Sequence, residues 1–444
     1  MNKLFCKLTL SAVLVGALLI FNGALITAHP NAVEIDDSMI HEYLIESFGY
    51  EFVENYFQAK EMVSELYDGL PVSRMGDVMY PAYFGGMYIN DDGELVILQV
   101  TDATLNEHTT LDTFEDAVFK SAEFSYRELN AVMDLLNWRI NGSEANASAW
   151  SLDVINNRVV VQLINYGADE IAEFRNTILD SPMVIFEEGE VVLLGGEQVQ
   201  DVRAFANPQI TPFNMPPFST TRPSANQPII QNPRPHIRTG DQIWFYRSGR
   251  GWLNHLSVGY RASNLDGRLG FVSAAHRDVQ PGLLSARGGL QAGDIVTNHQ
   301  GIRIGVVQRA QLQGLDAVFV VTDAGVVINS HGPLTYDGII VGQLVLSRGS
   351  QSGYQFATIS NANTSALVGN PLSNIRIDQG IRADINLIDG DSGGVVYTVT
   401  VNPTTNMAEI RGVAGINIAG NGFPLQGLFS RADAINRAFS LRLR

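Results

Sequence analysis

The hydrophobic pattern of the chain differs between its two halves. In the first half, apolar residues recur at helical spacing over 36–70, 111–140 and 168–179, which predicts helices there. Between them, 84–100 and 150–163 carry apolar runs on both sides of Asp-Asp-Gly and Asn-Asn turns, which predicts two β-hairpins. A hairpin followed by a helix thus occurs twice, which indicates an α+β region of two similar subdomains.

The second half has the pattern of an all-β protein. Short apolar runs such as LSVGYRA, AVFVVT and GVVYTVTV alternate with Gly, Asn and Asp turns. Only 430–443, close to the C-terminus, has helical spacing. The length of this part favours two small barrels over a single sandwich, with one helix at the end.

Between the halves lies a segment without apolar period. Residues 205–238 are crowded with Pro, Asn, Ser and Thr, which is typical of an exposed linker open to proteolytic nicking. We therefore expect an α+β region over 29–204, a linker over 205–238 and a β domain over 239–444.

The N-terminus has the layout of an export signal. Lys3 and Lys7 precede the apolar run Leu8–Phe21, and small residues follow it, with cleavage expected after Ala28 or Ala32. An uncleaved membrane anchor is the alternative. The single cysteine lies in this segment, so a disulfide framework and a Cys-based zinc site are excluded. The pattern predicts a signal peptide over 1–28 and a secreted product.

Charge divides the chain at the same place as hydropathy. The formal net charge is −17, but Val33–Arg203 carries 33 acidic and 8 basic residues, whereas 204–444 carries 13 acidic residues and 19 arginines without lysine. An acidic chain argues against nucleic acid as the main partner. The opposite net charges of the halves instead suggest two bodies that attract each other.

Three short motifs of the β domain suggest one reaction. His276 ends the apolar run FVSAAH, Asp316 opens the run GLDAVFV, and Ser392 lies in the glycine-rich turn GDSGG. A histidine can take the proton of a serine hydroxyl because its pKa lies near neutral, and a buried carboxylate holds the imidazole in the required tautomer. The order His, Asp, Ser on an all-β background predicts a nucleophilic triad.

The glycines around Ser392 suggest the second part of such a site. Backbone N–H groups of Gly390 and Ser392 can converge on a developing oxyanion, and a side chain at a flanking glycine would crowd that approach.

Other residues compete for these roles. Asp294 also opens an apolar run and is the second choice for the orienting carboxylate, with Asp323 as a further competitor. Asp391, inside the nucleophile turn, is expected to form a structural ion pair. The remaining histidines of the β domain have no motif around them, and surface or packing roles are expected for His255, His299 and His331.

From about Thr239 to the C-terminus, the sequence resembles the chymotrypsin-like serine peptidases, and within them the bacterial branch of alpha-lytic protease and the streptogrisins. Besides the triad motifs, LSRGSQSGYQFATIS and GVAGINIAGNG are similar to segments of that branch. The resemblance implies two six-stranded antiparallel barrels, with His276 as general base, Asp316 as orienting carboxylate and Ser392 as nucleophile. It also implies substrate-backbone pairing by three residues, namely Ile418, Ala419 and Gly420.

The first half resembles, more loosely, the pro-region of the same branch. MYINDDGELVILQV and SAWSLDVINNRVVVQL are similar to its hairpins. In that family the pro-region assists folding of the protease, occupies its cleft and is then removed. The resemblance therefore implies that the acidic half is an intramolecular partner of the β domain.

The sequence departs from the branch at several positions. Its disulfides are absent, Arg277 stands where cysteine is common, and Val395 stands where proline is common. Ile418 occupies a position where a serine hydroxyl often supports the triad aspartate, unless the alignment is off by one. Asn417 is a candidate substitute for that hydroxyl.

Together these observations predict a secreted serine endopeptidase that acts on proteins or peptides and is made as a precursor. We expect a monomer without metal or cofactor, with no nucleic-acid partner and no membrane association beyond export. A catalytically weak or inactive binding module on the same fold is the alternative. A third possibility keeps the acidic half attached as a regulatory domain.

Overall fold

The structure is a computed structural model in which Asp37–Arg444 forms one compact unit. The described residues are 37–73, 78–100, 114, 116–140, 146–189, 235–276, 289–331, 334–335, 338–368, 375–402, 404–422 and 425–444. The predicted signal peptide, 205–234 of the predicted linker, and Arg277 lie outside them.

The first half is an α+β region, as its hydrophobic pattern predicts. Its elements are α2 (Asp37–Phe48), α3 (Tyr50–Gly69), β1 (Phe84–Ile89), β2 (Leu95–Val100), β3 (Val118–Ala122), α4 (Tyr126–Arg139), β4 (Ala147–Asp153), β5 (Arg158–Leu163), α5 (Ala168–Thr177) and β6 (Val184–Glu188). Both predicted hairpins, β1–β2 and β4–β5, are confirmed. Each is extended by a parallel third strand, β3 beside β2 and β6 beside β5.

The prediction of one helix over 111–140 is wrong for its first part. Val118–Ala122 is the strand β3, because its backbone pairs with β2, a partner that helical spacing within a segment does not reveal. Helix α4 begins later, at a capping box in which the Ser125 side chain accepts from the Glu128 amide and the Glu128 carboxylate accepts from the Ser125 amide.

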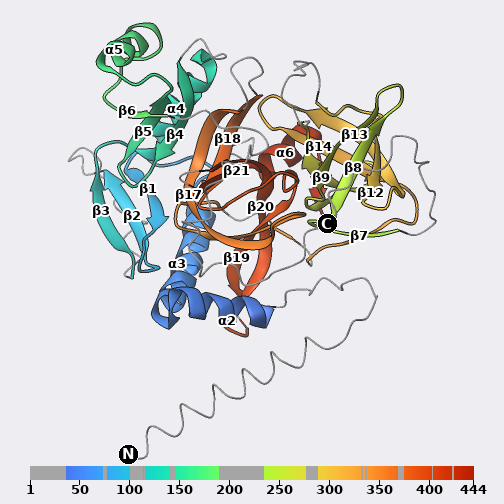
Figure 1. The fold of residues 1–444 in the computed structure, drawn as a ribbon. Coiled ribbons are helices and arrows are strands. Elements are labelled where there is room, and N and C mark those ends of the chain that lie inside the picture. The colour runs from blue at the N-terminus through green and yellow to red at the C-terminus, as the bar shows by residue number, and fades with distance from the viewer. Residues whose placement is uncertain are drawn as a thin grey trace, which may run out of the picture. The chain divides into compact units, whose positions relative to one another are not determined.

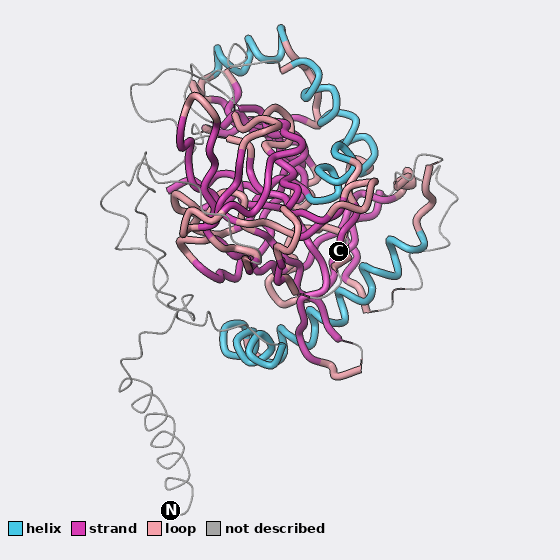
Figure 2. Tube along the Cα trace, turned by 90° about the vertical axis from the view of Figure 1, so that its right-hand side faces the viewer, coloured by secondary structure: helices cyan, strands magenta, loops and turns pink. Residues whose placement is uncertain are grey.

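Among the described residues from 235 onward, most lie in strands, drawn magenta in Figure 2, and one helix lies near the C-terminus. The all-β prediction is therefore confirmed. The elements are β7 (His236–Arg238), β8 (Gln242–Arg247), β9 (Gly251–Ser257), β10 (Arg261–Ser263), β11 (Leu269–Ala274), β12 (Ile295–Asn298), β13 (Arg303–Gln311), β14 (Ala317–Thr322), β15 (Val327–Asn329), β16 (Leu344–Gly349), β17 (Gly353–Val368), β18 (Ile375–Ala383), β19 (Val395–Asn402), β20 (Met407–Gly422), β21 (Leu425–Arg431), α6 (Ala432–Phe439) and β22 (Arg442–Leu443).

Most strands of the second half fall into two groups by their pairings (Figure 1). In the first group the order is β10-β11-β14-β13-β12-β8-β9. β9 leads into β10 through a stretch in which the Gly259 amide donates to the Val272 carbonyl at 2.9 Å. In the second group the order is β16-β19-β20-β21-β18-β17, and β16 also pairs with β17. In the second group, the first and last strands of the order are thus paired with each other.

The β region begins earlier than the predicted boundary at residue 239. β7 pairs in parallel with β15, and Ile237 is buried. Thr239 is also buried, and its hydroxyl accepts from Tyr397 Oη at 2.9 Å. The last residues of the predicted 205–238 linker therefore belong to the folded body.

Among the described residues, none of the helices is both long enough and apolar enough to span a bilayer.

Candidate active site

The pairing of two strands brings His276 and Asp316 together. His276 lies two residues after β11, Asp316 immediately precedes β14, and β11 pairs with β14 in antiparallel register with Ala274 opposite Ala317. The Nδ1 atom of His276 is 2.5 Å from Oδ2 of Asp316. Both side chains are buried, so the contact is shielded from water and from salt.

The other carboxylate oxygen of Asp316 is held by the backbone of the histidine segment. Oδ1 accepts hydrogen bonds from the amides of Ala275 at 3.0 Å and His276 at 2.7 Å. Since the carboxylate only accepts, the ring proton of a neutral His276 resides on Nδ1. Nε2 is then left with a lone pair, as a general base requires.

Ser392 lies in the turn that leads into β19 and is partly exposed, unlike the buried histidine and aspartate. Its hydroxyl donates to the backbone carbonyl of Ile418 at 3.1 Å. The predicted nucleophile thus lies against β20, the strand that carries the predicted substrate-pairing residues. The side chain of Ile418 is buried, and Ala419 is buried beside it.

The amide groups of the nucleophile turn fall into two sets. Three of them donate to backbone carbonyls: Asp391 to Ile388, Gly393 to Asn417 and Gly394 to Asp391. In the described part of the chain, the amides of Gly390 and Ser392 donate to no acceptor. These two are the predicted oxyanion donors, and unpaired N–H groups are what such a role requires.

Gly390 is anchored by two buried hydroxyls. Its carbonyl accepts from Ser257 Oγ at 2.7 Å and from Ser350 Oγ at 2.9 Å. Its φ is 95°, and a Cβ there would come within 2.9 Å of His255 Nε2 and 2.7 Å of Gln351 Cγ. Glycine is required at this position for both reasons.

The prediction that Asp391 forms an ion pair is wrong. Its carboxylate accepts from backbone amides instead: Oδ1 from Gln351 at 2.9 Å and Ser352 at 3.0 Å, and Oδ2 from Ile388 at 3.1 Å. Burial raises the pKa of Asp391, and these hydrogen bonds oppose that rise. The three amides stabilise the buried carboxylate without the desolvation cost that a buried cationic partner would add.

The two competing aspartates bind arginines. Asp294, the second choice for the orienting role, makes a bidentate pair with Arg247, with both N–O distances 2.6 Å. Asp323 pairs with Arg303 at 2.8 Å. The choice of Asp294 is therefore wrong: its two oxygens face a guanidinium, whose planar donors match a carboxylate.

Asn417 does not substitute for the missing serine hydroxyl. Its side-chain oxygen accepts from Ser347 Oγ at 3.0 Å, and its Nδ2 donates to the Asp391 carbonyl at 3.3 Å. The packing role expected of His255 is confirmed by its ring contact with Trp244 at 4.9 Å. His331 likewise packs on Tyr397 at 5.0 Å.

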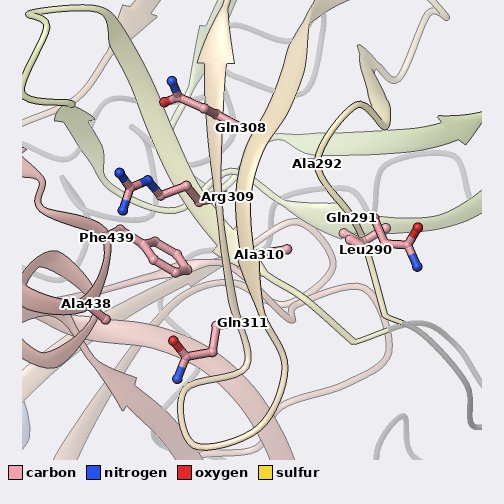
Figure 3. Close-up of a pocket in the computed structure, with 9 residues that line it drawn as sticks. All are labelled: Leu290, Gln291, Ala292, Gln308, Arg309, Ala310, Gln311, Ala438 and Phe439. Atoms are coloured by element: carbon pink, nitrogen blue, oxygen red, sulfur yellow. The ribbon is translucent and has the colours of Figure 1, made fainter.

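A cavity of about 500 Å³ lies elsewhere, between β13 and α6 (Figure 3). It is lined by Leu290, Gln291, Ala292, Gln308, Arg309, Ala310, Gln311, Ala438 and Phe439. None of the predicted site residues lines it. In the described chain, no group of three or more His, Cys, Asp and Glu side chains is placed to hold a metal ion.

Comparison with known families identifies the first half of the chain. Residues 28–120 match the model of the Pro-like N-terminal domain, and 127–189 match that of the Pro-like C-terminal domain. Residues 28–189, over which these two models match, are called the Pro-like region below. No curated protein sequence matches the chain.

Over about half of its length, the chain is similar to solved serine proteases. Nocardiopsis protease is 22% identical, with a TM-score of 0.35, over 47% of this chain and 100% of that one. Cellulomonas bogoriensis chymotrypsin is 23% identical, with a TM-score of 0.33, over 47% and 98% of the two chains. An alpha-lytic protease homolog is 15% identical, with a TM-score of 0.32, over 47% and 100%.

The Pro-like region binds the second group of strands through backbone and side chains. β4 pairs with β17, with Ser365 opposite Trp150. Tyr56 of α3 is fully buried, and its hydroxyl donates to the Val399 carbonyl at 3.0 Å and accepts from the Leu344 amide at 3.1 Å. Tyr43 stacks on Phe356 at 4.5 Å. The Pro-like region thus adds a strand beside β17 and bonds to the backbone of β16 and β19.

A cluster of partly buried tyrosines forms another part of this contact. Tyr80 packs edge-on against Tyr126 at 4.6 Å, and the charge of Arg431, which pairs with Asp433 at the start of α6, acts on both phenols and on Tyr67. Burial raises the pKa of all three phenols, and the charge of Arg431 opposes that rise.

From this cluster we predict that the full-length protein loses stability at alkaline pH. The folded-state pKa of each phenol lies above its ordinary value of 10.0, so stability that is present below pH 10 is lost as the pH rises beyond it. Each phenol contributes a slope of about 1.4 kcal/mol per pH unit. Urea unfolding of the full-length Ser392→Ala protein from pH 8 to 11.5 measures the slope, and Tyr126→Phe should reduce it.

Tyr166→Phe is the control, because this side chain is half exposed. An unchanged slope in Tyr126→Phe would contradict the assignment of the alkaline loss to the cluster.

Proposed function

We propose that the chain is a serine endopeptidase made as a precursor, in which Ser392 is the nucleophile, His276 the general base and Asp316 the orienting carboxylate. The bond between His276 Nδ1 and Asp316 Oδ2 supports the proposal, since it favours the tautomer in which Nε2 carries the lone pair that accepts the serine proton. The two groups of strands would be the two barrels of a chymotrypsin-like peptidase, with the site formed from both.

The reaction follows from the placement of these groups. The Ser392 hydroxyl turns from the Ile418 carbonyl to Nε2 of His276, and its oxygen attacks the substrate carbonyl as the proton moves to the imidazole. The amides of Gly390 and Ser392 receive the oxyanion. The imidazolium then protonates the leaving amine, and water hydrolyses the acyl-enzyme by the same steps.

The substrate backbone would lie along β20. Ile418, Ala419 and Gly420 adjoin the nucleophile, and the strand is irregular here, with a register shift between Asn417 and Ala419 in its pairing with β21. Such a bulge re-aims backbone groups at the place where a peptide would pair.

The Pro-like region would act as a folding template and inhibitor that is removed from a secreted enzyme. Its contacts with β16, β17 and β19 support the first role, because it bonds to backbone groups of strands that are distant in sequence. We propose that the processing cut lies within 205–234, because β7 begins at His236 and a cut inside it would divide the strand. Export rests on the N-terminal sequence.

One observation favours the alternative of a weak or inactive binding module. Ile418 stands where a hydroxyl would support Asp316, and the buried isoleucine side chain has no donor. Among the described residues, the Asp316 carboxylate therefore bonds only to the histidine segment. A weaker hold on the carboxylate would slow the reaction.

Labelling with a serine-directed phosphonate separates the two functions. The processed protein should form an adduct at Ser392, located by peptide mapping, and should cleave an unfolded protein substrate. N-terminal sequencing of the same sample places the processing site and shows whether the acidic half stays attached. A processed, folded protein without adduct would support the binding module.

A further inference from the structure

Asn417 makes four hydrogen bonds, three to the nucleophile turn and one to Ser347. Its backbone amide donates to the Gly394 carbonyl at 2.8 Å, and its carbonyl accepts from the Gly393 amide at 2.7 Å. Its side chain, which is fully buried, donates to the Asp391 carbonyl at 3.3 Å and accepts from Ser347 Oγ at 3.0 Å. No step described so far uses this side chain.

The carbonyl that Asn417 binds determines where an oxyanion donor points. The Asp391 carbonyl and the Ser392 amide belong to one planar, trans peptide, so C=O and N–H point in opposite directions. A group that fixes the carbonyl therefore fixes the N–H. The Asp391 carbonyl has two donors, the Gly394 amide within the turn and Asn417 Nδ2 from β20.

The surroundings hold the amide of Asn417 in one orientation. Ser347 Oγ donates to its oxygen, which leaves the NH2 group facing Asp391. A Cβ at Gly394 would lie 3.0 Å from Asn417 Nδ2 and 2.9 Å from the Asp391 oxygen. The last glycine of GDSGG thus provides the space in which this bond forms.

We propose that Asn417 is a positioning residue for the oxyanion hole: its side chain, oriented by Ser347, holds the Asp391–Ser392 peptide so that the Ser392 N–H faces the reacting carbonyl. This inference rests on the proposed peptidase function. The effect belongs to the transition state, where negative charge develops, and not to substrate binding.

The test compares Asn417→Leu and Asn417→Asp, which keep the approximate size and remove the donor, with wild type. Removing one donor outright costs about 10²–10³-fold in kcat, so misdirecting one should lower kcat by about tenfold to a hundredfold. KM should stay within about twofold, and the affinity for a peptide aldehyde, whose adduct develops the same oxyanion, should fall by the same factor as kcat. Ser347→Ala should show a smaller fall, because Asn417 keeps its donor but loses its orientation.

Asn436→Leu is the matched control. Asn436 is a buried asparagine on α6 whose Oδ1 accepts from Tyr260 at 2.9 Å, so its loss should lower thermal stability and leave kcat unchanged. If Asn417→Leu does not fold, Asn417→Asp and Ser347→Ala test the positioning role, using whichever of them folds. Unchanged kcat and aldehyde affinity in them, with an active wild type, would overturn the positioning role alone. A folded, processed wild type without hydrolysis would overturn the peptidase function as well.

Discussion

Ser392→Ala should reduce peptide hydrolysis by about 10⁴–10⁶-fold and leave the full-length precursor uncleaved. The hydroxyl lies at the mouth of the site, and its only described partner is a backbone carbonyl, so its removal should leave the fold intact. The turn is held by Asp391 and by the Gly390 carbonyl, neither of which bonds to Ser392 Oγ. Peptide turnover and the mass of the secreted product give the result.

Ser360→Ala is the control for this variant. Ser360 lies on β17, its hydroxyl is buried, and among the described residues it has no hydrogen-bond partner. Its loss should change neither turnover nor processing. Hydrolysis by Ser392→Ala at more than a hundredth of the wild-type rate would refute the assignment of the nucleophile.

Asp316→Asn should lower kcat by about 10⁴-fold while the protein stays folded. The amides of Ala275 and His276 need an acceptor, so the oxygen of the new side chain occupies the place of Oδ1 and its NH2 faces Nδ1. The imidazole must then accept at Nδ1 and carry its proton on Nε2. That tautomer cannot take the proton of Ser392. Steady-state kinetics and circular dichroism measure the two halves of the prediction.

Asp294→Asn serves as the comparison, because it alters a buried aspartate that contacts Arg247 instead of the histidine. It should lower the melting temperature, since Arg247 loses a bidentate partner, and change kcat by less than about twofold. The reverse outcome, with Asp294→Asn inactive and Asp316→Asn active, would exchange the roles of the two aspartates.

Local sequence patterns predicted the features whose structure depends on residues close together in the sequence. Spacing and turn residues predicted the hairpins β1–β2 and β4–β5 and the helix α5. The glycines of the turn GDSGG, where the space for a Cβ is lacking, predicted the candidate nucleophile Ser392. The strand β3 was not predicted, because Val118–Ala122 is a strand through its pairing with β2, which lies earlier in the sequence and does not show in the local pattern. The network around Asn417 escaped it too, since Ser347 is 70 positions away in the sequence.

The sequence alone determined the division of charge, the order of the three motifs and the β character of the second half, because each is a property of composition or of a short period. Only the tertiary structure shows which of Asp316 and Asp294, which both open apolar runs, lies beside His276. Pairing of β11 with β14 carries Asp316 to His276, whereas β12 and β8 bring Asp294 to Arg247. The physical reason is that a carboxylate acquires its role from the donor that strand pairing places beside it.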